Sequence, residues 1–106
     1  MLGPLTAELV DARCPAPQRK DIRELLSTQC AERLPLVDST PEWLALIDRV
    51  QLSTLRGSSW DFARISAKVA QANVDWRDSL LRAGFGSSLA AHRAWQAHAL
   101  LSGDIS

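Results

Sequence analysis

Residues 57–64 read GSSWDFAR, and residues 86–93 repeat their outline as GSSLAAHR. In each copy a glycine is followed by two serines and, after four other residues, by an arginine. Glycine adopts the left-handed conformation that ends many helices, and serine supplies an acceptor to the free N–H groups of the next helix. The first copy therefore predicts a helix that ends near Arg56 and a second helix that is capped by Ser58 or Ser59.

The chain before this stretch has the periodicity of two helices. Residues 18–34 place apolar side chains three and four positions apart, and Pro35 ends that pattern. Residues 39–43, STPEW, form a capping box in which Ser39 is the cap and Glu42 follows three positions later. These signals predict one amphipathic helix in the first segment and a second helix that begins in the box.

The chain after residue 57 has the same kind of punctuation. Asn73 is expected to close one helix, and Asp75 to cap a short helix over residues 76–83. In the second glycine–serine copy, Ser87 or Ser88 is expected to cap the last helix. Stop and start signals thus explain both copies, and we do not interpret the offset between them as a structural repeat.

These patterns together predict an all-α fold, because the period-two alternation of strands is absent. We expect one domain over residues 1–106, an orthogonal helical bundle of five or six short helices. Its N-terminal segment, residues 1–16, is expected to contain a short helix over residues 7–13, and the prolines of residues 14–18 predict a turn. The expected core residues are Ile22, Leu26, Leu44, Ile47, Val50, Phe62, Ile65, Val69, Leu80 and Leu81.

Composition excludes several classes of function. Apolar residues make up 46% of the chain, and its 12 basic and 12 acidic residues cancel. A neutral chain lacks the basic surface of nucleic-acid binders, so we expect no nucleic-acid partner. No apolar run approaches the roughly 20 residues of a membrane span, and the N-terminus has no basic segment typical of a secretory signal. We therefore expect a cytoplasmic protein with no membrane partner, in which Cys14 and Cys30 are free thiols.

No motif for a metal, cofactor or catalytic site stands out. His92 and His98 are six residues apart, which places them about 120° apart around one helix, too far for one ion. The two cysteines form no CxxC pair, and no GxSxG-type motif marks an activated nucleophile. Glycine–serine turns can hold a phosphate, but capping explains them without one. We expect neither a cofactor nor an enzymatic activity.

One alternative points to DNA. Residues 67–84, AKVAQANVDWRDSLLRAG, contain a helix, a turn of three or four residues and a short helix, and they resemble the helix-turn-helix of bacterial repressors. The resemblance implies a DNA-binding regulator. It departs from the pattern at Asn73, where a turn glycine is usual, and at Asp75 and Asp78, whose carboxylates would face the phosphates. Residues 75–86 also resemble stretches of small bacterial proteins, which implies no activity.

The four tryptophans and ten arginines favour a different interpretation. Tryptophan and arginine supply much of the binding energy in protein interfaces. Trp95 is the tryptophan expected to be exposed, with Trp60 as a second anchor and Arg93 and Arg64 as neighbouring charges. The sequence therefore favours a non-enzymatic protein–protein interaction module whose partner is another protein or a second copy of the chain.

Overall fold

The computed structural model describes residues 1–31, 34, 41–86 and 89–106, and it contains six helices within them. No strand occurs in these ranges, so the predicted all-α fold is confirmed. The helices are α1 (Pro4–Arg13), α2 (Ala16–Gln29), α3 (Pro41–Leu55), α4 (Phe62–Val74), α5 (Trp76–Arg82) and α6 (Leu89–Ser102).

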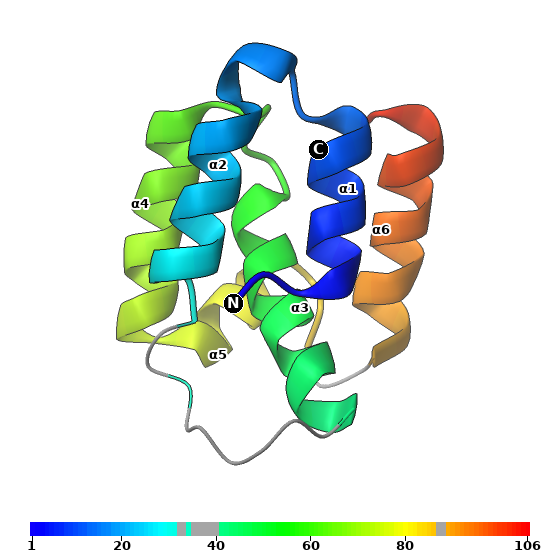
Figure 1. The fold of residues 1–106 in the computed structure, drawn as a ribbon. Coiled ribbons are helices and arrows are strands. Elements are labelled where there is room, and N and C mark those ends of the chain that lie inside the picture. The colour runs from blue at the N-terminus through cyan, green and yellow to red at the C-terminus, as the bar shows by residue number, and fades with distance from the viewer. Residues whose placement is uncertain (32–33, 35–40, 87–88) are drawn as a thin grey trace.

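Helix α3 is the centre of the bundle and packs against α1, α4, α5 and α6. Figure 1 shows α1 beside α6 and α2 beside α4, with the short α5 at one end of the molecule. A helix enclosed in this way must be apolar or hydrogen-bonded on every face. Residues 50–55 of α3 are all buried, and the hydroxyls of Ser53 and Thr54 accordingly donate to the carbonyls of Val50 and Gln51.

Most of the expected core is correct. The buried members are Ile22, Leu26, Ile47, Val50, Ile65, Val69 and Leu80. Phe62 and Leu81 were assigned wrongly, since they are 42% and 70% exposed, and Leu44 is half-buried. Phe62 is the first residue of α4, and Leu81 lies on the outward side of α5. Buried residues outside the prediction include Leu9 and Val10 of α1 and Ile105 of the C-terminal segment.

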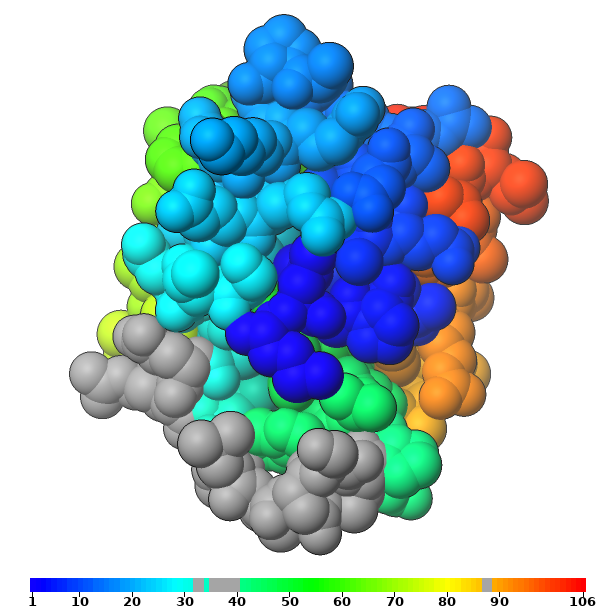
Figure 2. All heavy atoms as spheres, viewed as in Figure 1, coloured from blue at the N-terminus to red at the C-terminus, as the bar shows by residue number. Residues whose placement is uncertain are grey.

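The N-terminal segment is fixed to α3 by buried hydrogen bonds. Asp48 is 2% exposed, and its carboxylate accepts from the backbone N–H groups of Leu5 and Thr6 at 3.2 and 3.0 Å and from the Thr6 hydroxyl at 2.9 Å. Gln51 accepts from the N–H of Gly3 at 2.8 Å and donates to the Leu26 carbonyl at 3.1 Å. Figure 2 shows the first residues, in dark blue, lying between α1 and α2. Asp48 thus caps α1 from a distant position in the chain.

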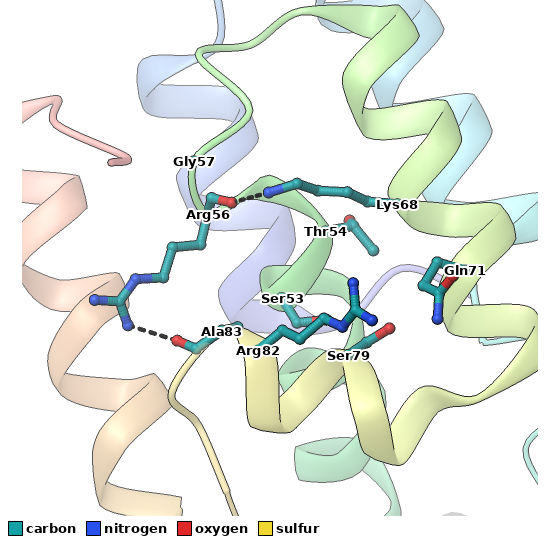
Figure 3. A pocket seen from close by; sticks show the side chains of 9 residues that line it. All are labelled: Ser53, Thr54, Arg56, Gly57, Lys68, Gln71, Ser79, Arg82 and Ala83. Carbon is teal, nitrogen blue, oxygen red and sulfur yellow. Dashed lines mark hydrogen bonds between the residues drawn. The ribbon is translucent and has the colours of Figure 1, made fainter.

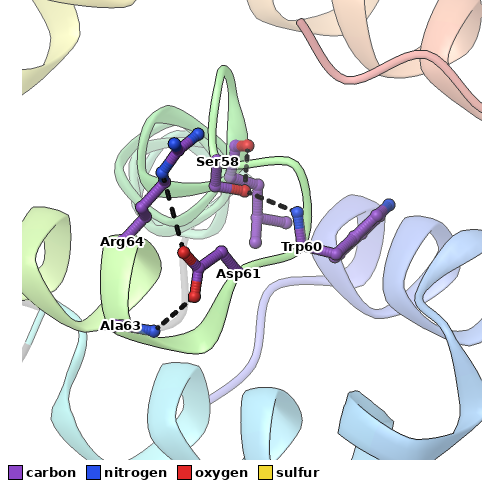
Figure 4. A network of polar contacts seen from close by, with 6 residues as sticks. Ser58, Trp60, Asp61, Ala63 and Arg64 are labelled. Carbon is purple, nitrogen blue, oxygen red and sulfur yellow. Dashed lines mark hydrogen bonds and ion pairs between the residues drawn. The ribbon is translucent and has the colours of Figure 1, made fainter.

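The helix stops were predicted better than the caps. Gly57 has φ +76° and lies two residues beyond the end of α3, close to the expected stop. The cap of α4 is Asp61, whose carboxylate accepts from the Ala63 N–H at 3.1 Å, so the assignment of Ser58 or Ser59 was wrong. Ser58 instead donates to the Leu55 carbonyl at 2.7 Å and accepts from the Trp60 N–H at 3.3 Å (Figure 4).

Other boundaries differ from the prediction because of proline. Residues 14–18 were predicted to form a turn, but α2 begins within them at Ala16 and contains Pro17 in its first turn. The first turn tolerates proline because its N–H groups have no partner within the helix. The same reason allows α1 to begin at Pro4.

The predictions for the end of α4 and for the start of α5 have different outcomes. Asp75 caps α5 as predicted, by accepting from the Asp78 N–H at 3.3 Å. Helix α4 runs one residue beyond Asn73, to Val74. The caps expected at Ser39, Ser87 and Ser88 lie outside the described residues.

Candidate functional site

The predicted anchor Trp60 is not a surface residue. It lies in the turn between α3 and α4 with φ +59° and is 7% exposed. Its neighbour Arg64 is exposed and lies 3.6 Å from the carboxylate of Asp61, the cap of α4 (Figure 4). The tryptophan therefore belongs to the core, and the arginine forms a local ion pair of the solvated kind that contributes little.

The expectation that Trp95 is exposed was also wrong. Trp95 is 8% exposed, its ring lies 5.7 Å from that of Phe85, and its indole N–H donates to the Ser106 carbonyl at 3.4 Å. Arg93 is exposed on the same helix. The structure thus places both predicted tryptophan anchors in the core and the two predicted arginines on α4 and α6, where they form no common surface with those rings.

An apolar groove between α3 and α5 is the more suitable surface, and we call it the Trp76 groove. It has a volume of about 370 Å³. It is lined by Leu46 and Arg49 of α3, by Trp76, Arg77, Leu80 and Leu81 of α5, and by Gly86. Leu46 and Trp76 are half-buried, and Leu81 is largely exposed at the rim. The only sequence signal for this surface is Leu81. It fits the apolar pattern of α5, but it is 70% exposed in the structure.

Two cations face this groove. The Arg49 guanidinium donates to the Gly86 carbonyl, while its buried Nε has no hydrogen-bond partner among the described residues. Burial lowers the pKa of Arg49, because a charge away from water is disfavoured. Arg77 lies over the Trp76 ring at 5.1 Å. None of the described lining residues is acidic, so the groove combines an apolar floor with uncompensated positive charge.

A second hollow, the basic pocket, lies where the end of α3 meets α4 and α5 (Figure 3). Its volume is about 270 Å³. The lining is polar and includes three cationic side chains, Arg56, Lys68 and Arg82, and three hydroxyls, Ser53, Thr54 and Ser79. Gln71, Gly57 and Ala83 complete it. No sequence pattern predicts this pocket, because its cations come from three separate helices or their ends.

Two of these cations also bind the ends of helices. Lys68 donates to the Arg56 carbonyl beyond α3, and Arg56 donates to the Ala83 carbonyl beyond α5 at 2.7 Å. Cations stabilise helix C-termini through such contacts. Arg56 also lies over the Phe85 and Trp95 rings at 5.6 and 5.9 Å, so its guanidinium is positioned by these rings and by the Ala83 carbonyl.

His92 is buried beside Phe85, with a ring separation of 6.3 Å. Neither ring nitrogen has a hydrogen-bond partner among the described residues. Burial, with the charges of Arg49 and Arg93 as smaller causes, lowers the pKa of His92 to about 4. The histidine is therefore neutral at pH 7, whereas His98, on the same helix, is exposed. The two histidines thus face different surroundings, as their spacing predicts.

The described residues contain no group of three or more His, Cys, Asp or Glu side chains that could hold a metal ion. Cys14 and Cys30 are both free and buried. Burial raises the pKa of both thiols, that of Cys30 to about 12. Thiols with raised pKa values are poor nucleophiles at neutral pH. These cysteines are therefore core residues rather than candidate reactive groups.

The helix-turn-helix alternative meets a geometric difficulty. Only Asp75 separates α4 from α5, in place of the expected turn of three or four residues. Helix α5 has 7 residues and packs against both α3 and α4. The helix-turn-helix pattern joins its two helices by a turn of three or four residues, which the single residue between α4 and α5 does not supply.

No helix among the described residues is long and apolar enough to cross a membrane. No family model, curated protein or solved structure matches the chain. The proposals for its function accordingly rest on the Trp76 groove and the basic pocket.

Proposed function

We propose that the protein is a non-enzymatic interaction module that binds another protein through the Trp76 groove. The observation that carries this proposal is the exposure of Leu81 at the rim of a groove whose floor is Leu46, Trp76 and Leu80. Exposed apolar surface around a concave site is typical of binding sites, whereas a single exposed leucine on a convex surface is not.

The charges of the groove indicate the chemistry of the partner. Arg49 and Arg77 flank the apolar floor, and no acidic residue among the described lining residues compensates them. A partner that inserts an apolar side chain and places a carboxylate beside it would satisfy both features. We therefore propose an acidic, amphipathic segment of a partner protein, in which aliphatic or aromatic residues alternate with Asp or Glu on one helical face.

A peptide selection tests this proposal without a known partner. A random peptide library is selected on the wild-type protein, and the enriched peptides are titrated against wild type and each variant by fluorescence anisotropy. We expect peptides that combine apolar and acidic residues. Truncation of an interface anchor costs about 2 kcal/mol or more, so Leu81→Asp should weaken their binding by more than tenfold. Arg77→Gln should weaken it less, because Arg77 is exposed.

Leu101→Asp is the matched control, since Leu101 is 81% exposed on α6 and does not line the groove. It should leave peptide binding unchanged. Peptides that bind Leu81→Asp and wild type equally, or that carry no acidic residues, would contradict the proposal. A homodimer that light scattering detects and Leu81→Asp dissociates would assign the groove to a second copy of the chain instead.

A further inference from the structure

The basic pocket has a chemistry that the proposed interaction does not use. It lies on a different side of α5 from the Trp76 groove: Ser79 and Arg82 face the pocket, while Trp76, Arg77, Leu80 and Leu81 line the groove. Lys68 and Arg82 approach it from α4 and α5. None of the described lining residues is a carboxylate. Three cations around one small hollow repel one another, and an anion in the hollow would relieve that repulsion.

Donors remain available in this pocket. A lysine ammonium has three N–H donors, and the Lys68 ammonium uses one of them on the Arg56 carbonyl. A guanidinium has five, and the Nε of Arg82 lies 2.7 Å from the Asp78 carboxylate. Figure 3 shows the rest of that guanidinium extending from α5 toward Thr54 and Gln71. Two side chains therefore have unused charged donors at the pocket.

Burial acts on the same lysine. It lowers the pKa of Lys68, and the charge of Arg64 adds to the effect. Both causes disfavour the ammonium as long as nothing negative lies beside it. An anion in the pocket would favour the charged form of Lys68 and so raise its pKa.

Two groups oppose an anion here. The carbonyls at the ends of α3 and α5 carry partial negative charge, but Lys68 and Arg56 each donate to one of them. Asp78 pairs with Arg82 and is itself half-buried, but it does not line the pocket. Counting Asp78 against Arg56, Lys68 and Arg82 leaves a charge of +2, which matches a phosphate monoester.

We propose that the basic pocket is a phosphate-binding site that takes a phosphate monoester on Lys68 and Arg82, beside the hydroxyl of Ser79. Arginine and lysine both bind phosphate through charge-assisted hydrogen bonds. The Ser79 hydroxyl is only weakly engaged, at 3.5 Å from the Asp75 carbonyl, and can turn toward the ligand. This site does not depend on the Trp76 groove.

Titration calorimetry with inorganic phosphate on the full chain tests the site. Lys68→Met removes one donor, and Arg82→Gln removes the other at a position that is exposed and therefore preserves the fold. A charge-assisted hydrogen bond contributes about 1.5 kcal/mol or more, so each variant should weaken phosphate binding about tenfold. The matched controls are Lys20→Met and Arg93→Gln, whose side chains are exposed and lie outside the pocket. They should bind phosphate as wild type does.

Two further titrations identify the source of the phosphate. Tighter binding of O-phosphoserine than of inorganic phosphate would assign the pocket to phosphorylated side chains, and tighter binding of adenosine monophosphate would assign it to nucleotides. Either result supports the site if Arg82→Gln abolishes the preference. Equal binding by wild type, Lys68→Met and Arg82→Gln, or no heat with any of the three ligands, would overturn the proposal. Unchanged phosphate binding by Leu81→Asp would also show that the phosphate site does not depend on the Trp76 groove.

Discussion

Asp48 and Arg49 are neighbours in the chain, and they face two opposite kinds of surrounding. On one side of α3, the Asp48 carboxylate receives three hydrogen bonds from residues 5 and 6 and is nearly inaccessible to water. On the other side, Arg49 keeps a buried Nε without a partner among the described residues and faces the Trp76 groove. Buried polar groups in proteins are usually paired. The Asp48 side is thus hydrogen-bonded within the fold, and under our proposal the Arg49 side is the one that meets a ligand.

The largest expected effect is on the Asp48 side. Asp48→Ala leaves two backbone N–H groups and one hydroxyl without their acceptor, in a buried or partly buried position, and it removes the cap of α1. We expect the free energy of unfolding to fall by about 3 kcal/mol, measured by urea denaturation. Asp11→Ala is the control, because Asp11 is exposed and pairs with Arg23 at the surface; it should cost less than about 1 kcal/mol. Similar losses for the two variants would show that the Asp48 network does not hold the fold.

The next effect depends on pH and concerns His92, which lies on the Arg49 side. The folded-state pKa of His92 is about 4, below the unfolded value of 6.5, so the unfolded state binds more protons between these values. The stability that comes from the neutral ring is fully present above pH 6.5 and is lost as the pH falls toward 4. We expect the free energy of unfolding to be about 2 kcal/mol lower at pH 5 than at pH 7 from this group.

The same urea experiment on His92→Leu isolates that contribution. Leucine does not titrate, so the variant should lose less stability between pH 7 and pH 5 than wild type does. A variant that loses as much as wild type over this window would assign the acid sensitivity to carboxylates elsewhere.

A smaller change is expected from Arg49 itself. Arg49→Met removes a charge that burial disfavours, along with one hydrogen bond to the Gly86 carbonyl. Because these two effects oppose each other, we expect the free energy of unfolding to change by less than about 1 kcal/mol. A loss as large as that of Asp48→Ala would mean that Arg49 belongs to the structural framework, and the contrast between the two neighbours would fail.

The smallest effect should come from Leu81. Leu81→Ser replaces an exposed apolar side chain, so the melting temperature should stay close to that of wild type, with a free-energy change within about 0.5 kcal/mol. The selected peptides should nevertheless bind more weakly. Unchanged stability with lost binding separates a ligand surface from the core, whereas a marked fall in melting temperature would place Leu81 among the packing residues.

The sequence predicted what depends on near neighbours in the chain. Gly57 and Asp75 act within a few residues, and their roles at helix ends were correct. The cap of α1 could not be predicted, because Asp48 reaches it from α3. Trp95 was misplaced for a similar reason: Ile105 is buried and the Ser106 carbonyl accepts from the Trp95 indole, so residues beyond α6 fold back toward that ring. Both groove and pocket need the packing of α3 against α5, which no local pattern encodes.

The pairing of α1 with α6 has a consequence for how the chain is made. Helix α1 is synthesised long before its neighbour α6 and the buried Ile105. Gln96 of α6 donates to the Leu5 carbonyl, and the Ile105 carbonyl accepts from the Gly57 N–H at 2.6 Å, so each contact joins an early residue to a late one. The face of α1 that packs against α6 therefore stays uncovered until α6 has been made. Chains that stop before α6 should therefore expose apolar surface of α1 and associate more readily than chains that include α6.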